Sequence, residues 1–329
     1  MAAVPMVELW RGGRLESTHS GHAVVWGPGG IEASWGDPGA VIFPRSSCKM
    51  IQALPLIESG AAAAAGLTER QLALSCASHQ GAAIHTEAVT EWLAGLGLGE
   101  ADLRCGSHLP YDAAAQKALV CSDTAPCQIH NNCSGKHSGF LTLNKHLGGG
   151  PEYVEPAHPV QRAVLEAFED VTGEVSPGFG IDGCSAPNFA TSVAGLARAM
   201  AFFAAANPEG GHREAAAARL ARAMMAYPEM VAGEGRACTL LMRAMEGKVA
   251  VKTGAEAVFV AILPEQKRGI ALKILDGATR ASEAAITALL VRYGALPAAH
   301  PIARKYAGAP LTNWRGLVTG EMRIAAGFA

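Results

Sequence analysis

The hydrophobic period changes twice along this chain, and this change constrains the fold more than any other feature of the sequence. Residues 5–43 hold short apolar, β-prone runs between the turns RGGR, GPGG and GDPG, a pattern typical of strands. From Ser46 to about residue 246, apolar side chains recur every three or four residues, as on the buried face of a helix. After Gly247, EAVFVAIL and GIALKIL flank PEQKR and predict a β-hairpin.

Strand-like runs that are separated from helical runs indicate an α+β fold rather than a regular alternation of strand and helix. We therefore expect a mainly antiparallel sheet with flanking helices, a helical subdomain, and residues 282–296 as the closing helix. Residues 1–45 and 247–329 are expected to form the sheet-containing subdomain. Residues 46–246 are expected to form the mostly helical one, within one continuous folding unit.

The overall charge narrows the classes of partner. The 329 residues carry a net charge of −2, so no excess of Lys and Arg attracts nucleic acid or an anionic membrane. The first residues, MAAVPMVELWRGG, do not have the pattern of a signal peptide, and no apolar run of about 18 residues predicts a membrane span. Eight cysteines in such a chain predict mostly buried thiols in a reducing cytoplasm, not a disulfide scaffold.

The stretch FPRSSCKM (43–50) brings together four side chains that can attack a carbonyl or move a proton. On a helix, residues three apart share a face and residues two apart do not, so Ser46, not Ser47, is the expected partner of Lys49. A buried, neutral lysine can take the serine proton, and the free N–H groups of a helix start favour an oxyanion. The alternative is a capping serine followed by a surface lysine.

A second motif, Lys252-Thr253-Gly254, stands at the start of the returning strands. S-x-x-K and K-T-G occur together in serine β-lactamases and penicillin-binding proteins, and serine-dependent glutaminases share this plan. The glycine lets a substrate backbone approach. Their third motif, S-x-N, has an imperfect counterpart in Ser78-His79-Gln80, which is alternatively a loop of capping polar groups.

Two polar loops that contain glycine precede helical patterns, as is typical of a ligand pocket. They are HNNCSGKHSG (130–139) and GIDGCSAPN (180–188). Cys133 and Cys184 can converge with Lys136 or His137 on a zinc ion, with water completing the shell, although no C-x-x-C pair is present. A catalytic cysteine, paired with His137, is the other functional alternative.

Six motifs together resemble the bacterial L-asparaginase II family of the Rhizobium type: PRSSCK, LSCASHQG, CGSHLPYD, HNNCSGKHSG, GIDGCSAPNFA and KTGAEAV. The resemblance extends from about Val7 to the final helix. It implies hydrolysis of the side-chain amide of L-asparagine to aspartate and ammonia. It also implies a fold similar to that of glutaminases and serine β-lactamases, and association as a homodimer.

The resemblance also implies roles for individual residues. Ser46 is implied as the nucleophile and Lys49 as its base. Ser78 and Lys252 are implied as a second serine–lysine couple. The implied zinc site consists of Cys133, Lys136 and Cys184.

Two positions depart from the family pattern. Met50 stands where a proline is expected after the lysine, and Ala257 stands where a glycine is usual. Neither residue is a proposed reacting group.

A substrate that is an amino acid carries a carboxylate and an ammonium group. From charge and neighbourhood, we expect Arg45 to bind the first and Asp182 or Glu256 the second. Three further polar residues are expected in the pocket: His79, Asn132 and His137. The alternatives are a glutaminase or penicillin-type acyl hydrolase, and a non-enzymatic amino-acid or zinc sensor.

Overall fold

The computed structural model describes residues 2–329, which form two compact units. Unit 1 comprises the residues up to Ser47 together with Thr191–Ala205 and Leu240–Ala329. Unit 2 comprises Cys48–Ala190 and Ala206–Thr239.

Unit 1 is built on an eight-stranded antiparallel sheet with the order β11-β12-β1-β2-β10-β9-β8, in which β3 also pairs with β2. Its early strands are β1 (Val4–Arg11), β2 (Arg14–Gly27) and β3 (Gly30–Trp35). Its late strands are β8 (Ala250–Thr253), β9 (Val258–Leu263), β10 (Arg268–Ile274), β11 (Pro310–Thr312) and β12 (Val318–Ile324). Because β2 pairs with β10, with Val24 opposite Ala271, segments from both ends of the chain share one sheet. The predicted α+β fold with an antiparallel sheet is confirmed.

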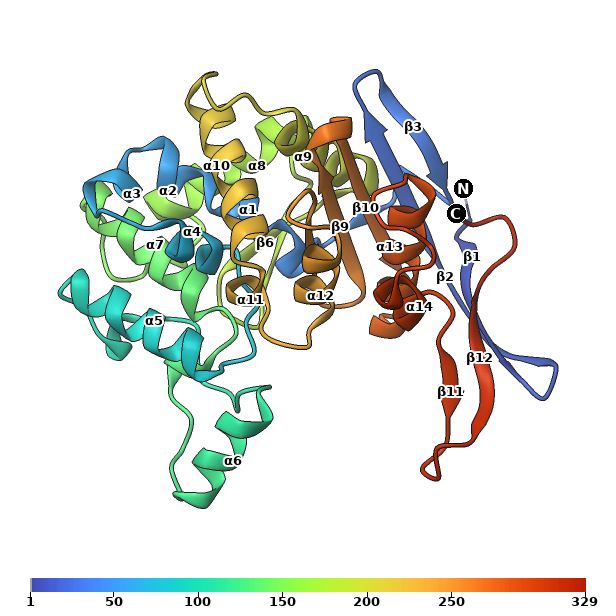
Figure 1. Cartoon of the computed structure of the whole chain (residues 1–329). Helices are drawn as coiled ribbons and strands as arrows, with labels where there is room; N and C mark the ends of the chain where they lie inside the picture. Colours follow the sequence, from blue (N-terminus) through green and yellow to red (C-terminus); the bar gives the residue numbers. More distant parts are fainter. Residues whose placement is uncertain (1) are drawn as a thin grey trace. The chain divides into compact units, whose positions relative to one another are not determined.

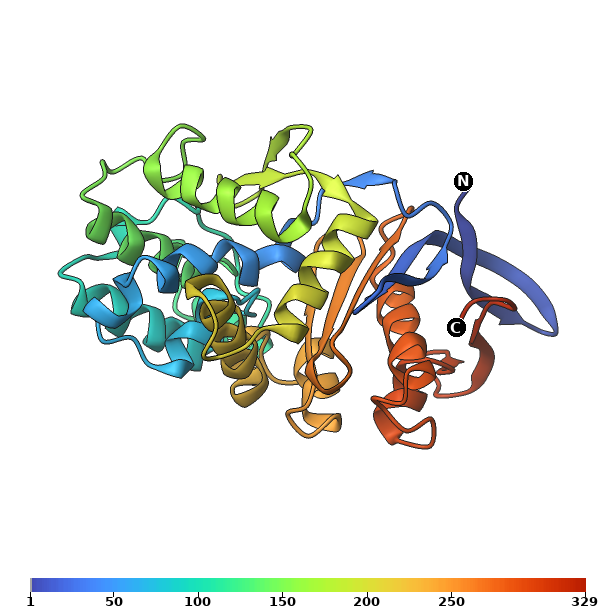
Figure 2. The ribbon, with the colours of Figure 1, turned by 90° about the horizontal axis from the view of Figure 1, so that it is seen from above.

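Two helices cover opposite faces of this sheet (Figure 2): α9 (Val193–Ala205) and α13 (Thr279–Arg292). Every residue of β9 is buried, as expected for a strand that is covered on both sides. Gly269 of β10 lets α9 approach closely, because a Cβ at this position would lie 2.1 Å from the nitrogen of Ala201 and 2.3 Å from the oxygen of Ala197.

Gly269→Ala is therefore expected to lower the free energy of unfolding by about 1–3 kcal/mol, the usual cost of overpacking a core. Chemical denaturation measures this change. Gly29→Ala is the matched control, because Gly29 is exposed and a Cβ there meets nothing within 4 Å. The control should stay within about 0.5 kcal/mol of the unsubstituted protein. Equal losses in both variants would contradict the close packing of α9 on β10.

The end of the chain differs from the prediction. The expected closing helix, residues 282–296, corresponds to α13, but α14 (Pro301–Tyr306), β11 and β12 follow it. β12 extends the sheet by pairing with β1, with Val7 opposite Ile324. Met322 is the buried residue of β12, so this strand lacks the alternation by which strands are recognised.

The segment after Pro44 consists of short helical pieces. It forms a 3₁₀ turn η1 (Arg45–Cys48) and the short helices α1 (Lys49–Gln52) and α2 (Leu54–Glu58). Pro55 lies in the first turn of α2, where its missing N–H costs nothing. Gly60 adopts φ 84° between α2 and the next helix, α3 (Ala61–Ala64).

Unit 2 is mostly helical, and α7 (Ser134–Leu147) lies at its centre. The first eleven residues of α7 are buried, and the surrounding helices include α3 (Ala61–Ala64), α4 (Glu69–Ser75), α5 (Ala83–Gly95) and α8 (Pro159–Thr172). The unit also contains α10 (His212–Ala226), α11 (Pro228–Val231) and the pair β5 (Phe179–Ile181) and β6 (Pro187–Phe189). By contrast, α6 (Ala113–Cys121) has no buried residue and lies apart from the other helices of its unit (Figure 1).

No helix within residues 2–329 has the length and apolar character that crossing a membrane requires.

The division into units departs from the predicted boundaries at α9. This helix falls within residues 46–246, which were expected to be one helical part, but it groups with unit 1. The reason is that α9 packs on β2, β9 and β10. The apolar stripe of α9 indicates a buried face, but such a stripe does not reveal which core it joins. A short pair, β4 (Val41–Ile42) and β7 (Thr191–Ser192), precedes α9 in unit 1, and α12 (Ala237–Ala244) spans the boundary at residue 240.

Candidate active site

Lys49 lies within a buried polar cluster of unit 2. It begins α1 and only 1% of its surface is exposed. Its Nζ donates to the carbonyl oxygen of Ala77 at 2.5 Å, to Ser78 Oγ at 3.1 Å and to Cys133 Sγ at 3.1 Å. The structure thus brings three predicted site residues, Lys49, Ser78 and Cys133, into direct contact.

Backbone hydrogen bonds hold the two loops of this cluster together. The N–H of Ser78 donates to the oxygen of Val231 at 2.9 Å, and the N–H of His79 donates to the oxygen of Asn132 at 3.2 Å. Cys133 precedes α7, and its N–H donates to Asn131 Oδ1 at 2.8 Å. These bonds place the sequence around Ser78 beside the start of α7.

A second contact joins Cys184 to Lys136, whose Nζ lies 3.0 Å from the sulfur. A hydrogen bond from Cys133 is the largest influence on Cys184, and together with the Lys136 charge it holds the pKa of Cys184 well below its usual value although burial opposes this shift. The same hydrogen bond, aided by burial, raises the pKa of Cys133. Burial alone would lower the pKa of Lys136, but the charges of Cys184, Cys133 and Asp182 outweigh it and raise that pKa. Both pKa shifts favour an ammonium–thiolate pair of Lys136 and Cys184.

The fit of this cluster to a zinc ion depends on the lysine. Within residues 2–329, no group of three or more His, Cys, Asp and Glu side chains suits a metal ion. A zinc site here needs Lys136 as the third protein ligand beside Cys133 and Cys184. The two thiolates fit, because thiolates are zinc ligands, and Lys136 can join them only after it gives up its proton. Zinc stays a prediction.

His79 is fully buried, and both of its ring nitrogens are used inside the protein. The N–H of Gly81 donates to Nδ1 at 3.1 Å, so Nε2 carries the hydrogen and donates to Ser134 Oγ at 3.0 Å. Ser134 Oγ in turn donates to the oxygen of Ile129 at 2.9 Å. Burial holds the pKa of His79 well below its usual value. We therefore assign His79 to the support of the α7 start, in place of the expected contact with substrate.

His137 is equally buried, which differs from the expected place in an open pocket. Burial lowers the pKa of His137 to about 4, so the ring is neutral at ordinary pH. Its Nδ1 lies 2.9 Å from the hydroxyl of Tyr153. No sequence pattern marked Tyr153, which lies in the loop between α7 and α8.

The other expected substrate contacts lie nearer the surface. Asn132 and Asp182 are half-buried in unit 2, and the charge of Asp182 acts on Lys136. Arg45 is half-buried and Glu256 exposed in unit 1. The backbone oxygen of Glu256 accepts a hydrogen bond from Lys273 at 2.6 Å.

Within unit 1, the K-T-G strand lies against the turn that carries Ser46. A Cβ on Gly254 would lie 2.6 Å from the oxygen of Pro44 and 3.1 Å from the nitrogen of Ser47. β8, which holds Lys252, is an edge strand of the sheet. Lys252 is fully buried, and its Nζ donates to the oxygen of Thr253 at 2.7 Å. Gly254 of the K-T-G motif and the turn at Pro44 and Ser47 are therefore neighbours within unit 1.

Ser46 and Ser47 differ in the way that the S-x-x-K spacing predicts. Ser47 is fully buried, and its Oγ donates to the oxygen of Pro44 at 2.7 Å. Ser46 is half-buried and leads directly to α1. The local structure thus uses Ser47 to close the turn and leaves Ser46 as the candidate nucleophile.

Four residues in or next to the site motifs adopt a left-handed backbone conformation. The φ angle is 54° at Arg45, 68° at Ser185, 56° at Glu256 and 56° at Ala257, and residues with a Cβ adopt this region only at a cost. Ala257 occupies the position where the family pattern expects glycine. Its positive φ explains that preference, because glycine adopts this conformation without a Cβ penalty.

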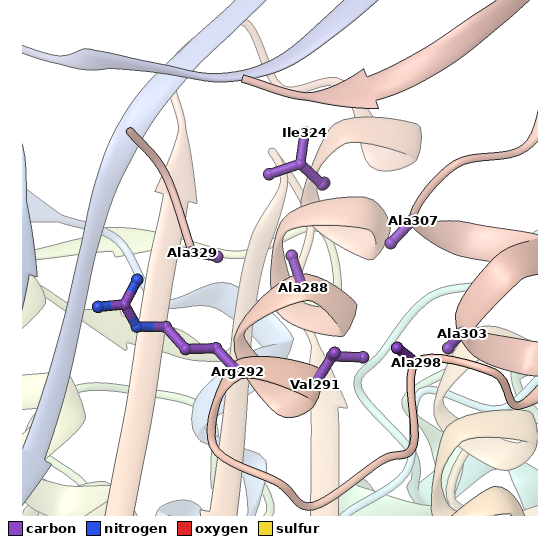
Figure 3. Close-up of a pocket in the computed structure, with 8 residues that line it drawn as sticks. All are labelled: Ala288, Val291, Arg292, Ala298, Ala303, Ala307, Ile324 and Ala329. Carbon is purple, nitrogen blue, oxygen red and sulfur yellow. The ribbon is translucent and has the colours of Figure 1, made fainter. Parts of the chain in front are cut away.

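A cavity of about 400 Å³ in unit 1 contains none of the predicted site residues (Figure 3). Its lining comes from α13, α14, β12 and the chain end: Ala288, Val291, Arg292, Ala298, Ala303, Ala307, Ile324 and Ala329. The lining offers no nucleophile, acid or base besides one guanidinium, so we place the candidate active site at the serine–lysine and cysteine–lysine clusters instead.

The chain is similar to several solved structures of low identity. A β-lactamase, Mb2281c from Mycobacterium bovis, shares 14% identity over 84% of this chain and 95% of its own, with a TM-score of 0.45. Mglu in its tris and glutamate form shares 14% identity over 85% of this chain, with a TM-score of 0.49, and the match covers 60% of the Mglu chain. A penicillin-binding protein homologue from Pyrococcus abyssi shares 12% identity over 90% and 80% of the two chains, with a TM-score of 0.39.

The family assignment comes from the sequence of nearly the whole chain. Residues 7–324 match the family model of L-asparaginase II, so the chain belongs to the L-asparaginase II family. This membership supports an amidohydrolase activity. No curated protein matches the chain.

Proposed function

We propose that this protein hydrolyses the side-chain amide of L-asparagine to L-aspartate and ammonia. The observation that carries the proposal is the family match over residues 7–324. The contact between Lys49 and Ser78 supports it, because hydrolysis through a serine needs hydroxyls near groups that exchange protons.

In the proposed mechanism, Ser46 attacks the amide carbon and Lys49 accepts its proton. Two residues separate them in the chain, so the covalent backbone keeps them near one another. Backbone N–H groups at the turn that carries Ser46 are proposed to stabilise the oxyanion. Ammonia leaves with a proton that Ser78 and Lys252 help to pass; this role of the second couple rests on the family resemblance. Water then hydrolyses the aspartyl ester, which releases aspartate and regenerates Ser46.

Recognition of the substrate needs one positive and one negative protein group. We propose Arg45, which precedes Ser46, for the carboxylate. Asp182 is a better candidate than Glu256 for the ammonium group, because its charge acts on the buried cluster of unit 2. Glu256 is exposed, and Lys273 bonds its backbone. Asn132 remains a candidate for a polar contact with the substrate.

If zinc binds, Cys133, Lys136 and Cys184 hold it, and it supplies a fixed positive charge between the two polar loops. The thiolate of Cys184 is already stabilised for this role. The homodimer expected from the family stays a prediction.

Ammonia release tests the proposed function. L-asparagine, L-glutamine and a chromogenic β-lactam are offered separately to the full-length protein, and L-asparagine should have the highest kcat/KM. Faster turnover of glutamine or the β-lactam would move the protein to one of the alternative hydrolases. Binding of asparagine without any ammonia release would identify a sensor instead.

Gly254→Ala is expected to lower kcat for L-asparagine by roughly 10- to 100-fold, because small displacements of reacting groups have effects of this size. The new methyl group would force the strand away from Pro44 and Ser47 and so displace Ser46. Steady-state kinetics measure the change. The exposed Gly29→Ala variant should retain full activity, and full activity of Gly254→Ala would contradict the contact between the two motifs.

A further inference from the structure

The tautomer of His137 follows from its contact with Tyr153. The Tyr153 side chain is fully buried, and its oxygen accepts a hydrogen bond from the N–H of Arg104 at 2.8 Å. Among the described residues, the remaining polar contact of this hydroxyl is His137 Nδ1, at 2.9 Å. A buried hydroxyl needs an acceptor, so its hydrogen points to Nδ1. Nδ1 is then the acceptor, and Nε2 carries the hydrogen of the neutral ring.

The Nε2–H group lacks a hydrogen-bond partner within residues 2–329, although it is completely buried. Cys184 lies 3.0 Å from Nζ of Lys136, the residue next to His137, and His137 helps to lower the pKa of Cys184. Because Nδ1 is occupied by Tyr153, Nε2 is the nitrogen that remains for the sulfur. A thiolate, free or bound to metal, accepts hydrogen bonds, so Cys184 is the acceptor that we infer for this group.

Aromatic contacts limit the rotation of the His137 ring. Its centroid lies 5.7 Å from that of Phe140 and 5.6 Å from that of Tyr153, and both pairs meet edge to face. Lys136 Nζ lies 5.1 Å from the Phe140 centroid. The histidine is thus packed against the same aromatic ring as the lysine of the cluster.

We propose that Tyr153 is a positioning residue of the cysteine–lysine cluster: its hydroxyl holds His137 with Nε2–H directed at Cys184, and this fixes the sulfur for a thiophilic divalent metal ion. The inference rests on the metal-binding part of the proposed function. Outer contacts of this kind typically change metal affinity 10- to 100-fold.

The test uses the full-length protein, stripped of metal and titrated with Co²⁺ as a spectroscopic substitute for zinc. The thiolate-to-cobalt charge-transfer absorption reports sulfur ligation, and competition with Zn²⁺ gives the zinc affinity. Tyr153→Phe should weaken zinc binding roughly 10- to 100-fold while the charge-transfer band persists at saturation. Thermal unfolding of the metal-free variants checks the fold.

A matched pair at His137 tests the same inference with Tyr153 intact. The amide of His137→Gln places an N–H near the position of Nε2, whereas the amide of His137→Asn reaches only the position of Nδ1. The Gln variant should therefore bind zinc more tightly than the Asn variant, at similar stability. If Tyr153→Phe fails to fold, this pair still tests whether the Nε2–H group of His137 positions Cys184.

The outcomes separate the two levels of the proposal. If the unsubstituted protein shows the charge-transfer band and the folded variants bind zinc as tightly as it does, the positioning role is overturned and the metal site stands. Equal losses in the Gln and Asn variants would likewise overturn the positioning role. Absence of the band in the unsubstituted protein would overturn the metal site and this inference together, while asparagine hydrolysis by Ser46 would still be testable separately.

Discussion

Replacement of Ser46 by alanine is expected to lower kcat for L-asparagine on the order of 10⁴-fold or more, the range seen when a catalytic nucleophile is removed. The variant lacks the oxygen that forms the ester, and Lys49 then has no hydroxyl at this position to activate. Ser46 is half-buried, so the free energy of unfolding should change by less than about 1 kcal/mol. Ammonia release and chemical denaturation measure the two effects.

Ser47→Ala is the matched control for this experiment. Ser47 lies next to Ser46, but its Oγ donates to Pro44 within the turn. Removing that buried hydrogen bond should cost about 1 kcal/mol of stability and leave kcat within tenfold of the unsubstituted protein. An inactive Ser47→Ala beside an active Ser46→Ala would transfer the nucleophile to Ser47 and contradict the S-x-x-K spacing.

Replacement of Lys49 by methionine is expected to lower kcat by about 10²- to 10⁴-fold, the usual contribution of a positioned general base. Methionine keeps much of the shape of lysine but has no amine to accept the proton of Ser46. The carbonyl of Ala77 and the hydroxyl of Ser78 also lose a donor. An unsatisfied buried acceptor costs about 1–3 kcal/mol, which denaturation should detect.

Lys49→Arg distinguishes a base from a fixed charge. The guanidinium keeps a positive charge and hydrogen-bond donors but does not lose its proton in proteins. If Lys49 acts as the base, the arginine variant should be nearly as inactive as the methionine variant. Substantial activity in a folded Lys49→Arg protein would show that the site needs only the charge.

The architecture followed from sequence where the hydrophobic period was strong. Residues 256–275 predicted a hairpin, and β9 and β10 form it. The pairing of β2 with β10 agrees with strand-like runs at both ends of the chain. β12 was missed because its exposed side chains leave little pattern, and its pairing with β1 spans more than 300 residues of sequence.

Local spacing also led to the choice of the candidate nucleophile, which stays a prediction. The three-residue interval between Ser46 and Lys49 favoured Ser46, and the hydrogen bond of Ser47 to Pro44 agrees with that choice. The convergence of Cys133, Lys136 and Cys184 was implied by the family resemblance, and the structure brings their side chains together in one cluster.

Other features of the site depend on packing that no short pattern records. Lys49 contacts Cys133, 84 residues away, because α1 and the start of α7 pack in one unit. His79 and His137 were expected in the substrate pocket, yet both side chains are fully buried. Tyr153 lies in a loop without periodicity, so its contact with His137 was not foreseeable.

The most direct test is peptide mapping by mass spectrometry of protein that is quenched with acid during turnover of L-asparagine. The proposed mechanism predicts an aspartyl ester on the peptide that contains Ser46, and its disappearance together with ammonia release in Ser46→Ala. An ester on the peptide that contains Ser78, or full ammonia release by Ser46→Ala, would contradict it.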